Sequence, residues 1–118
     1  MKRYLFVMRH APHLSSHVQE ALDQLLTTAA FDQAVSVLFV DHGILQLKRG
    51  QNPSLLGGRD TAAVLGALSM YDVEQVFVER ESLLALGLTK ADLGMPVHLI
   101  ARHDVNALLA SHDIIIPD

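Results

Sequence analysis

The chain has 118 residues, half of them hydrophobic, a formal net charge of −4 and no cysteine. This length suffices for one core, so we expect a single domain over residues 1–118. The acidic balance argues against direct nucleic-acid binding, and the lack of thiols excludes disulfides, thiolate metal sites and cysteine nucleophiles.

The first part of the chain has the pattern of a strand, a helix and a second strand. Residues 4–8 are apolar and predict a buried strand that ends before Pro12, because proline cannot continue a central ladder. Ser16, with Gln19 three residues later, predicts a capping box, and apolar residues recur along one face of the helix that follows. Residues 34–40 are typical of a strand buried on both faces. Two strands joined by a helix predict a right-handed parallel unit.

The rest of the chain continues this alternation. In order, it predicts a helix from Asn52 or Arg59 to Tyr71, a strand over 73–78, a short helix that stops at Gly87, a turn from Thr89 to Asp92, a strand over 97–101, a helix that Asp104 caps through Ala110, and a strand over 113–117. The count favours an α/β fold, a three-layer sandwich whose mostly parallel five-stranded sheet carries helices on both faces.

The 4–8 run is too short for an export signal, and no segment reaches the roughly 18 apolar residues of a membrane span. We therefore expect a cytoplasmic protein with no membrane contact.

Polar residues follow the second strand. Asp41, His42 and Gly43, the last able to take a positive φ, stand where its carboxyl end meets the sheet edge that binds ligands in open α/β folds. The apolar segment 44–47 has no helix start signal and is not needed by the sheet pattern. We expect that segment to be exposed or covered by a partner.

The end of the first strand offers an alternative function. Arg9 and His10 resemble the strand-end Arg-His-Gly of histidine phosphatases, in which the imidazole takes a phosphoryl group and the arginine neutralises its charge. Ala11 replaces the glycine, and no later histidine stands in a matching motif. A phosphohydrolase that uses Arg9 and His10 is therefore kept only as an alternative.

Three histidines are spaced so that they could approach one metal ion: His10, His13 and His17. No cysteine or carboxylate completes a recognisable ligand pattern with them. We expect neither a metal nor a cofactor.

Longer motifs occur together over essentially the whole chain, at 2–3, 11–13, 20–26, 39–47, 50–53, 59–60, 68, 71–75, 82–83, 87–88 and 113–115. The most specific combination is D-x-G-x-x-Q-L over 41–47 with Y-D-V-E-Q over 71–75. On these motifs the chain resembles the DsrE/DsrF-like family of sulfur-relay proteins, and within it the TusC and DsrF subunits.

The resemblance implies a DsrE-like domain that assembles with TusB-like and TusD-like sister subunits into a hetero-hexamer. Such a TusBCD complex passes persulfide sulfur toward 2-thiolation of the tRNA wobble uridine, and a DsrEFH complex of dissimilatory sulfur oxidation is the alternative. The family's sulfur-carrying cysteine follows the third strand, at a position that matches Glu79. Since a carboxylate cannot carry a persulfide, the resemblance implies a non-catalytic subunit of a sulfurtransferase complex.

The resemblance also suggests a role for the residues after the second strand. We expect them to form a subunit interface, with an apolar centre and polar residues that set its register. The expected interface residues are Asp41, His42, Gly43, Ile44, Leu45, Gln46 and Leu47.

Overall fold

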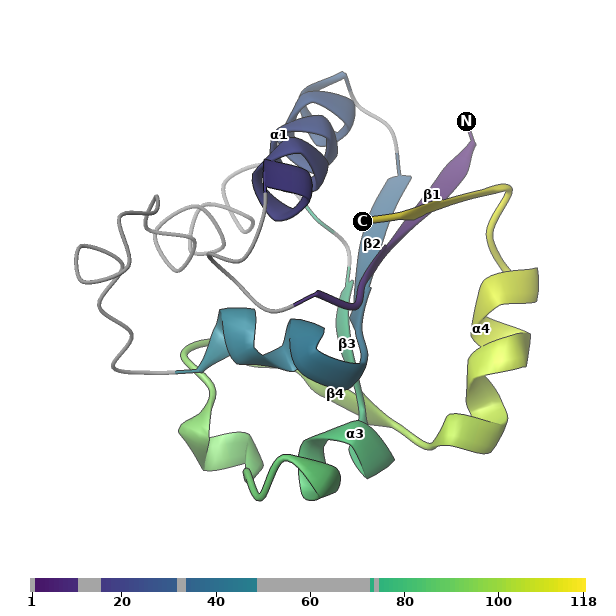
Figure 1. Cartoon of the computed structure of the whole chain (residues 1–118). Helices are drawn as coiled ribbons and strands as arrows, with labels where there is room; N and C mark the ends of the chain where they lie inside the picture. The colour runs from purple at the N-terminus through teal and green to yellow at the C-terminus, as the bar shows by residue number, and fades with distance from the viewer. Residues whose placement is uncertain (1, 11–15, 32–33, 49–72, 74) are drawn as a thin grey trace.

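A computed structural model describes residues 2–10, 16–31, 34–48, 73 and 75–118 (Figure 1). Its strands form a five-stranded sheet in the order β4-β3-β2-β1-β5, in which neighbouring strands pair in parallel. The strands are β1 (Arg3–Met8), β2 (Ala34–Phe39), β3 (Gln75–Glu79), β4 (His98–Ile100) and β5 (Ile114–Pro117). The predicted parallel sheet is confirmed, and its carboxyl ends share one edge.

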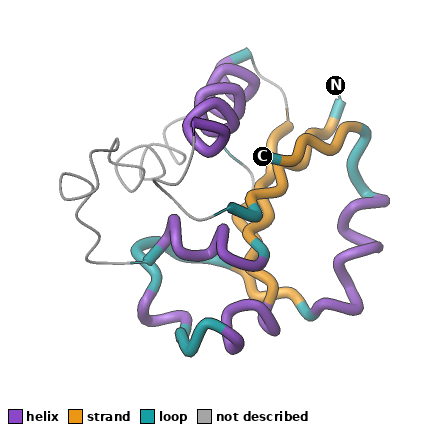
Figure 2. Tube along the Cα trace, viewed as in Figure 1, coloured by secondary structure: helices purple, strands orange, loops and turns teal. Residues whose placement is uncertain are grey.

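Helices cover both faces of this sheet (Figures 1 and 2). Apolar side chains of α1, of the 3-10 helix η1 and of α3 pack on one face, and those of α4 pack on the other. These helices are α1 (Ser16–Ala30), η1 (Asp41–Leu47), α3 (Arg80–Ala85) and α4 (Val105–Ala110), and the short 3-10 turns η4 (Lys90–Asp92) and η5 (Arg102–Asp104) flank β4. No described helix is both long enough and apolar enough to cross a membrane.

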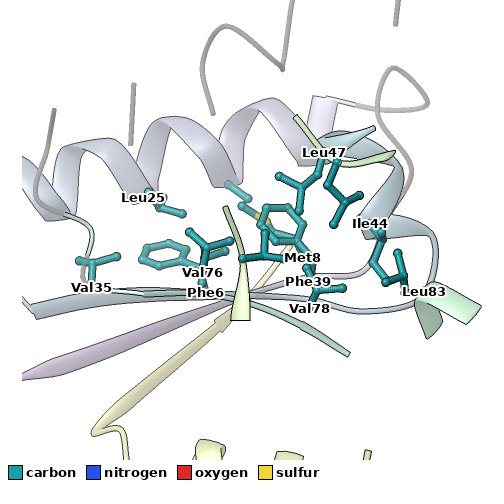
Figure 3. Close-up of a cluster of buried hydrophobic side chains, with 14 of the residues drawn as sticks. Phe6, Met8, Leu25, Val35, Phe39, Ile44, Leu47, Val76, Val78 and Leu83 are labelled. Carbon is teal, nitrogen blue, oxygen red and sulfur yellow. The ribbon is translucent and has the colours of Figure 1, made fainter. Parts of the chain in front are cut away.

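The main core lies on the face that α1 and η1 cover. Phe6, Met8 and Phe39 project from β1 and β2 toward Leu25 of α1 and Ile44 of η1, and all five side chains are fully buried (Figure 3). Burying each such side chain stabilises the fold by about 1.5–3 kcal/mol relative to exposure. The opposite face has a smaller core, centred on Leu5, Leu38 and Val40.

Local signals in the second half of the chain are largely confirmed. Gly87 takes a φ of +71° just after α3, and Thr89 with Asp92 forms the capping box at the start of η4. Asp104 occupies the position before α4, but its side chain makes no capping hydrogen bond, so its predicted capping role is wrong. The predicted helix ending at Tyr71 lies outside the described residues.

The segment 44–47 differs from the prediction. It belongs to η1, whose turns direct Ile44, Gln46 and Leu47 inward, where they are 0%, 0% and 4% exposed. Ile44 and Leu47 join the main core with Leu83 of α3 (Figure 3). The expectation that these side chains lie exposed or against a partner is therefore wrong, because the chain itself buries them.

Candidate functional site

The candidate site lies at the carboxyl edge of the sheet, where the loops after four parallel strands meet. Arg9 and His10 follow β1, and Asp41 and His42 follow β2. The other contributors come from α3, after β3, and from the start of η5, after β4. Together these loops line a cavity of about 510 Å³ formed by Arg9, His10, Asp41, His42, Ser82, Ala85, Leu86 and Arg102.

Glu79, the position that the family resemblance singles out, is only 7% exposed and contacts two residues of the cavity lining, Ser82 and Arg102. Its Oε1 accepts hydrogen bonds from Ser82 Oγ at 2.5 Å, from Arg102 Nη2 at 3.0 Å and from Arg102 Nε at 3.2 Å. The hydrogen bond to Glu79 raises the pKa of Arg102 above its ordinary value. Glu79 is thus an anchored structural carboxylate.

Hydrogen bonds connect the ends of three strands, through Ser82 between β2 and β3 and through Glu81 to the loop after β4. The backbone N–H of Asp41, after β2, donates to Ser82 Oγ at 3.0 Å, and the Ser82 hydroxyl donates in turn to Glu79. Glu81 accepts from the backbone N–H of Arg102 at 2.9 and 3.1 Å, a bond that lowers the pKa of this carboxyl. These contacts hold the loops after β2, β3 and β4 in a defined arrangement.

The loop after β1 is held by the carboxylate of Asp118, whose side chain is fully buried. It accepts from the backbone N–H groups of Arg9 and His10 at 3.0 and 3.2 Å, and its Oδ1 lies 2.9 Å from His10 Nδ1. On the other side, Gln46 Nε2 donates to the His10 carbonyl at 3.0 Å. His10 is therefore fixed by two segments distant from it in the sequence.

Gly43 is needed for a reason other than a positive φ. A Cβ at this position would lie 2.0 Å from the Met8 carbonyl oxygen, closer than any real contact. The positive φ, 50°, belongs to Asp41, one of the few residue types besides glycine that visit this region. The absence of a side chain at residue 43 thus lets η1 pass directly over the end of β1.

Metal binding receives no support in the described part of the chain, where no group of three or more His, Cys, Asp or Glu side chains is placed to hold an ion. His10 lies at the cavity, whereas His13 and the side chain of His17 lie outside the description.

Three residues of the site were not predicted: Ser82, Arg102 and Asp118. Arg102 carries a weak signal in the sequence, because it follows a predicted strand and parallel strands end at one edge. The only sequence signal at Ser82 is its place within a family motif, and Asp118 carries no signal, since its partners Arg9 and His10 lie 108–109 residues away.

The site offers charged and polar groups that can bind a partner or a small ligand, and the chain has no thiol. The Glu79 carboxylate accepts three hydrogen bonds, while Arg9 and His42, both exposed, line the cavity.

Comparisons with known proteins bear on this site. A sequence model of the DsrE/DsrF-like family matches residues 2–117. The chain is 41% identical over 93 residues to the Intracellular sulfur oxidation protein DsrF of Allochromatium vinosum, covering 79% of this chain and 68% of that protein. It is 37% identical over 109 residues to the Protein TusC homolog of Vibrio parahaemolyticus, covering 92% of each. It is 32% identical over 113 residues to the Protein TusC homolog of Aliivibrio fischeri, covering 96% of each.

Solved structures share the fold at low sequence identity. The ychN protein from E. coli superposes with a TM-score of 0.86, and MTH1491 from Methanobacterium thermoautotrophicum with 0.74. Each is 17% identical, with complete coverage of both chains, so the likeness bears on the fold alone. The comparisons lend no support to the phosphohydrolase alternative for Arg9 and His10, because the family that matches is a different one.

Proposed function

Because this chain belongs to the DsrE/DsrF-like family, we propose that it is a non-catalytic subunit of a TusBCD-like sulfur-relay complex, which passes persulfide sulfur toward 2-thiolation of the tRNA wobble uridine. The family membership confirms the resemblance that the sequence motifs indicated. The observation that carries the proposal is the match to proteins named TusC homolog, which spans 92–96% of both chains.

The non-catalytic part of the proposal rests on chemistry. Sulfur transfer through a persulfide requires a thiolate, and the 118 residues include no cysteine. At the position that the resemblance assigns to the sulfur-carrying cysteine, Glu79 is hydrogen-bonded to Ser82 and Arg102. A carboxylate held in this way stabilises the loops around it and leaves the sulfur chemistry to a sister subunit.

The partners that we propose are TusB-like and TusD-like subunits, in a cytoplasmic hetero-hexamer. The expected interface over residues 41–47 needs one revision, because only Asp41, His42 and Leu45 reach the surface. These three side chains would contact a partner, while Gly43, Ile44, Gln46 and Leu47 would hold η1 in place from within.

Dissimilatory sulfur oxidation in a DsrEFH-like complex is the second candidate. The relative named Intracellular sulfur oxidation protein DsrF is the most identical of those compared above, at 41%. Its alignment covers 68% of that protein, against at least 92% for the TusC homologs. The match in length therefore favours the tRNA-thiolation complex.

Co-expression tests the proposal directly. The full chain would be produced alone and together with TusB and TusD proteins, and the native mass of each product would be measured. A complex with two copies of each subunit, formed only when all three are present, is the expected result. A chain that remains separate from both proteins would contradict the proposal.

A second readout distinguishes the two pathways. In a bacterium whose own TusC gene is deleted, the chain should restore 2-thiouridine, measured by the retardation of tRNA in mercury-containing gels. Assembly with TusB and TusD without restored thiolation would favour the sulfur-oxidation alternative.

A further inference from the structure

Apart from Asp41 and His42, the residues that line the cavity at the carboxyl edge of the sheet lie outside the proposed interface over residues 41–47. The polar lining residues of the cavity are Arg9, Arg102, His10, His42, Ser82 and Asp41. We propose that this cavity binds a small tetrahedral oxyanion of the sulfate or phosphate class, held between Arg9 and Arg102. The proposal does not depend on which complex the chain joins.

Arg9 brings a positive charge that no neighbour neutralises in the described part of the chain. Its backbone N–H donates to Asp118, while that carboxylate is otherwise engaged by His10. Within the described residues no salt bridge joins Arg9 to an acidic side chain, and Arg9 lines the cavity. An unneutralised guanidinium beside a cavity is a suitable donor for an oxyanion.

Arg102 faces the same cavity from another loop and is held in place. Its Nε and Nη2 donate to Glu79, which positions the planar group and leaves Nη1 without a partner among the described residues. The Arg102 side chain is positively charged, because arginine stays protonated at neutral pH. The ion pair with Glu79 thus orients the Arg102 guanidinium and leaves its Nη1 group able to donate to a ligand.

The remaining walls complete the site. His42 is exposed at the cavity and adds an imidazole that has no hydrogen-bond partner in the described residues. Ala85 and Leu86 form an apolar wall, which limits hydration on that side and strengthens the attraction between charges.

Asp41 also lines the cavity, and its negative charge restricts the ligand. A ligand must engage both arginines to overcome repulsion from this carboxylate. A tetrahedral oxyanion presents oxygens in several directions and can accept from Arg9 and Arg102 together, whereas a planar carboxylate presents two oxygens on one side. The site therefore favours a tetrahedral oxyanion over a peptide carboxylate.

Calorimetric titration of the full chain tests the proposal. Sodium sulfate, thiosulfate and phosphate would be titrated separately, with acetate as the planar comparison and ionic strength held constant with chloride. Arg9→Gln should weaken binding about tenfold, because it removes a charge-assisted donor. Arg80→Gln, the same charge change at an exposed residue outside the cavity lining, should leave binding unchanged.

A third variant, Asp41→Asn, should change oxyanion affinity in the direction opposite to Arg9→Gln. It should tighten oxyanion binding about threefold by removing the repulsive charge. Asparagine accepts the positive φ of this position, and a gain in affinity cannot result from misfolding. Saturable binding with these three responses would support the site. Absence of binding by the unmodified chain, equal weakening by Arg9→Gln and Arg80→Gln, or acetate binding as tight as sulfate would overturn it.

Discussion

Glu79 and Arg102 form an ion pair at 3.0 Å that joins the end of β3 to the loop after β4. The Glu79 side chain is 9% exposed, whereas the Arg102 side chain is 63% exposed, so one partner is buried and the other lies at the surface. This asymmetry makes Glu79 the structural member of the pair.

The first prediction concerns that pair. Glu79→Gln should lower the free energy of unfolding by roughly 1–2 kcal/mol, because the charge-assisted bonds weaken while solvent screens the exposed guanidinium. Urea denaturation followed by circular dichroism measures the change. Arg102→Lys, which keeps the positive charge, should cost less than Arg102→Gln. Equal stability of Glu79→Gln and the unmodified chain would show that the pair contributes nothing.

Gly43 and Gly87 form a matched pair for the second prediction. Gly43→Ala should cost several kcal/mol or prevent folding, because its Cβ would lie 2.0 Å from the Met8 carbonyl oxygen. Gly87→Ala should cost only about 1–2 kcal/mol, since the new methyl group meets nothing within 4 Å and the sole penalty is the φ of +71°. The midpoints of thermal unfolding give the ranking. Similar midpoints would contradict the close approach of η1 to β1.

The third prediction separates the buried and accessible parts of η1. Leu47→Asp should abolish folding, because a carboxylate would replace a side chain that is 4% exposed in the core. Leu45→Asp should leave the circular dichroism spectrum unchanged but prevent co-purification with TusB and TusD, as expected for a half-buried interface residue. Phe31→Asp, 73% exposed beyond the end of α1, is the surface control and should assemble normally. Normal assembly of Leu45→Asp would remove Leu45 from the proposed interface.

The fourth prediction uses the capping box at η4. Hydrogen bonds from the backbone N–H and hydroxyl of Thr89 lower the pKa of Asp92 below its ordinary value of 3.8. A carboxyl with a depressed folded-state pKa contributes stability above its unfolded-state pKa and loses it as the pH falls through the folded-state pKa. Asp92→Asn should therefore be less stable than the unmodified chain at pH 7, and the difference should shrink as the pH falls below 3.8 and through the folded-state pKa. Denaturation curves over this pH range measure it, and a constant difference would contradict the assignment.

Local patterns predicted most of the secondary structure correctly. Apolar runs predicted β1 and β2, the helical period predicted α1, and Gly87 predicted the end of α3. These predictions succeeded because each signal depends on residues that are close in the sequence. The prediction failed at 44–47, where four apolar and polar residues are too few to display a helical period. Their burial depends instead on contact with α3, about 40 residues further along the chain.

By itself the sequence determined that this is an α/β domain without a thiol, since composition and hydrophobic period are properties of the chain alone. The tertiary structure decided which side chains meet. Glu79 forms hydrogen bonds with Arg102 and Ser82, and Asp118 accepts hydrogen bonds from the backbone of Arg9 and His10. All of these residues lie at the carboxyl edge of the sheet. The physical reason is the strand order β4-β3-β2-β1-β5, which brings the carboxyl ends of distant segments together. The order of the strands in the sheet cannot be predicted from the spacing of these residues in the sequence.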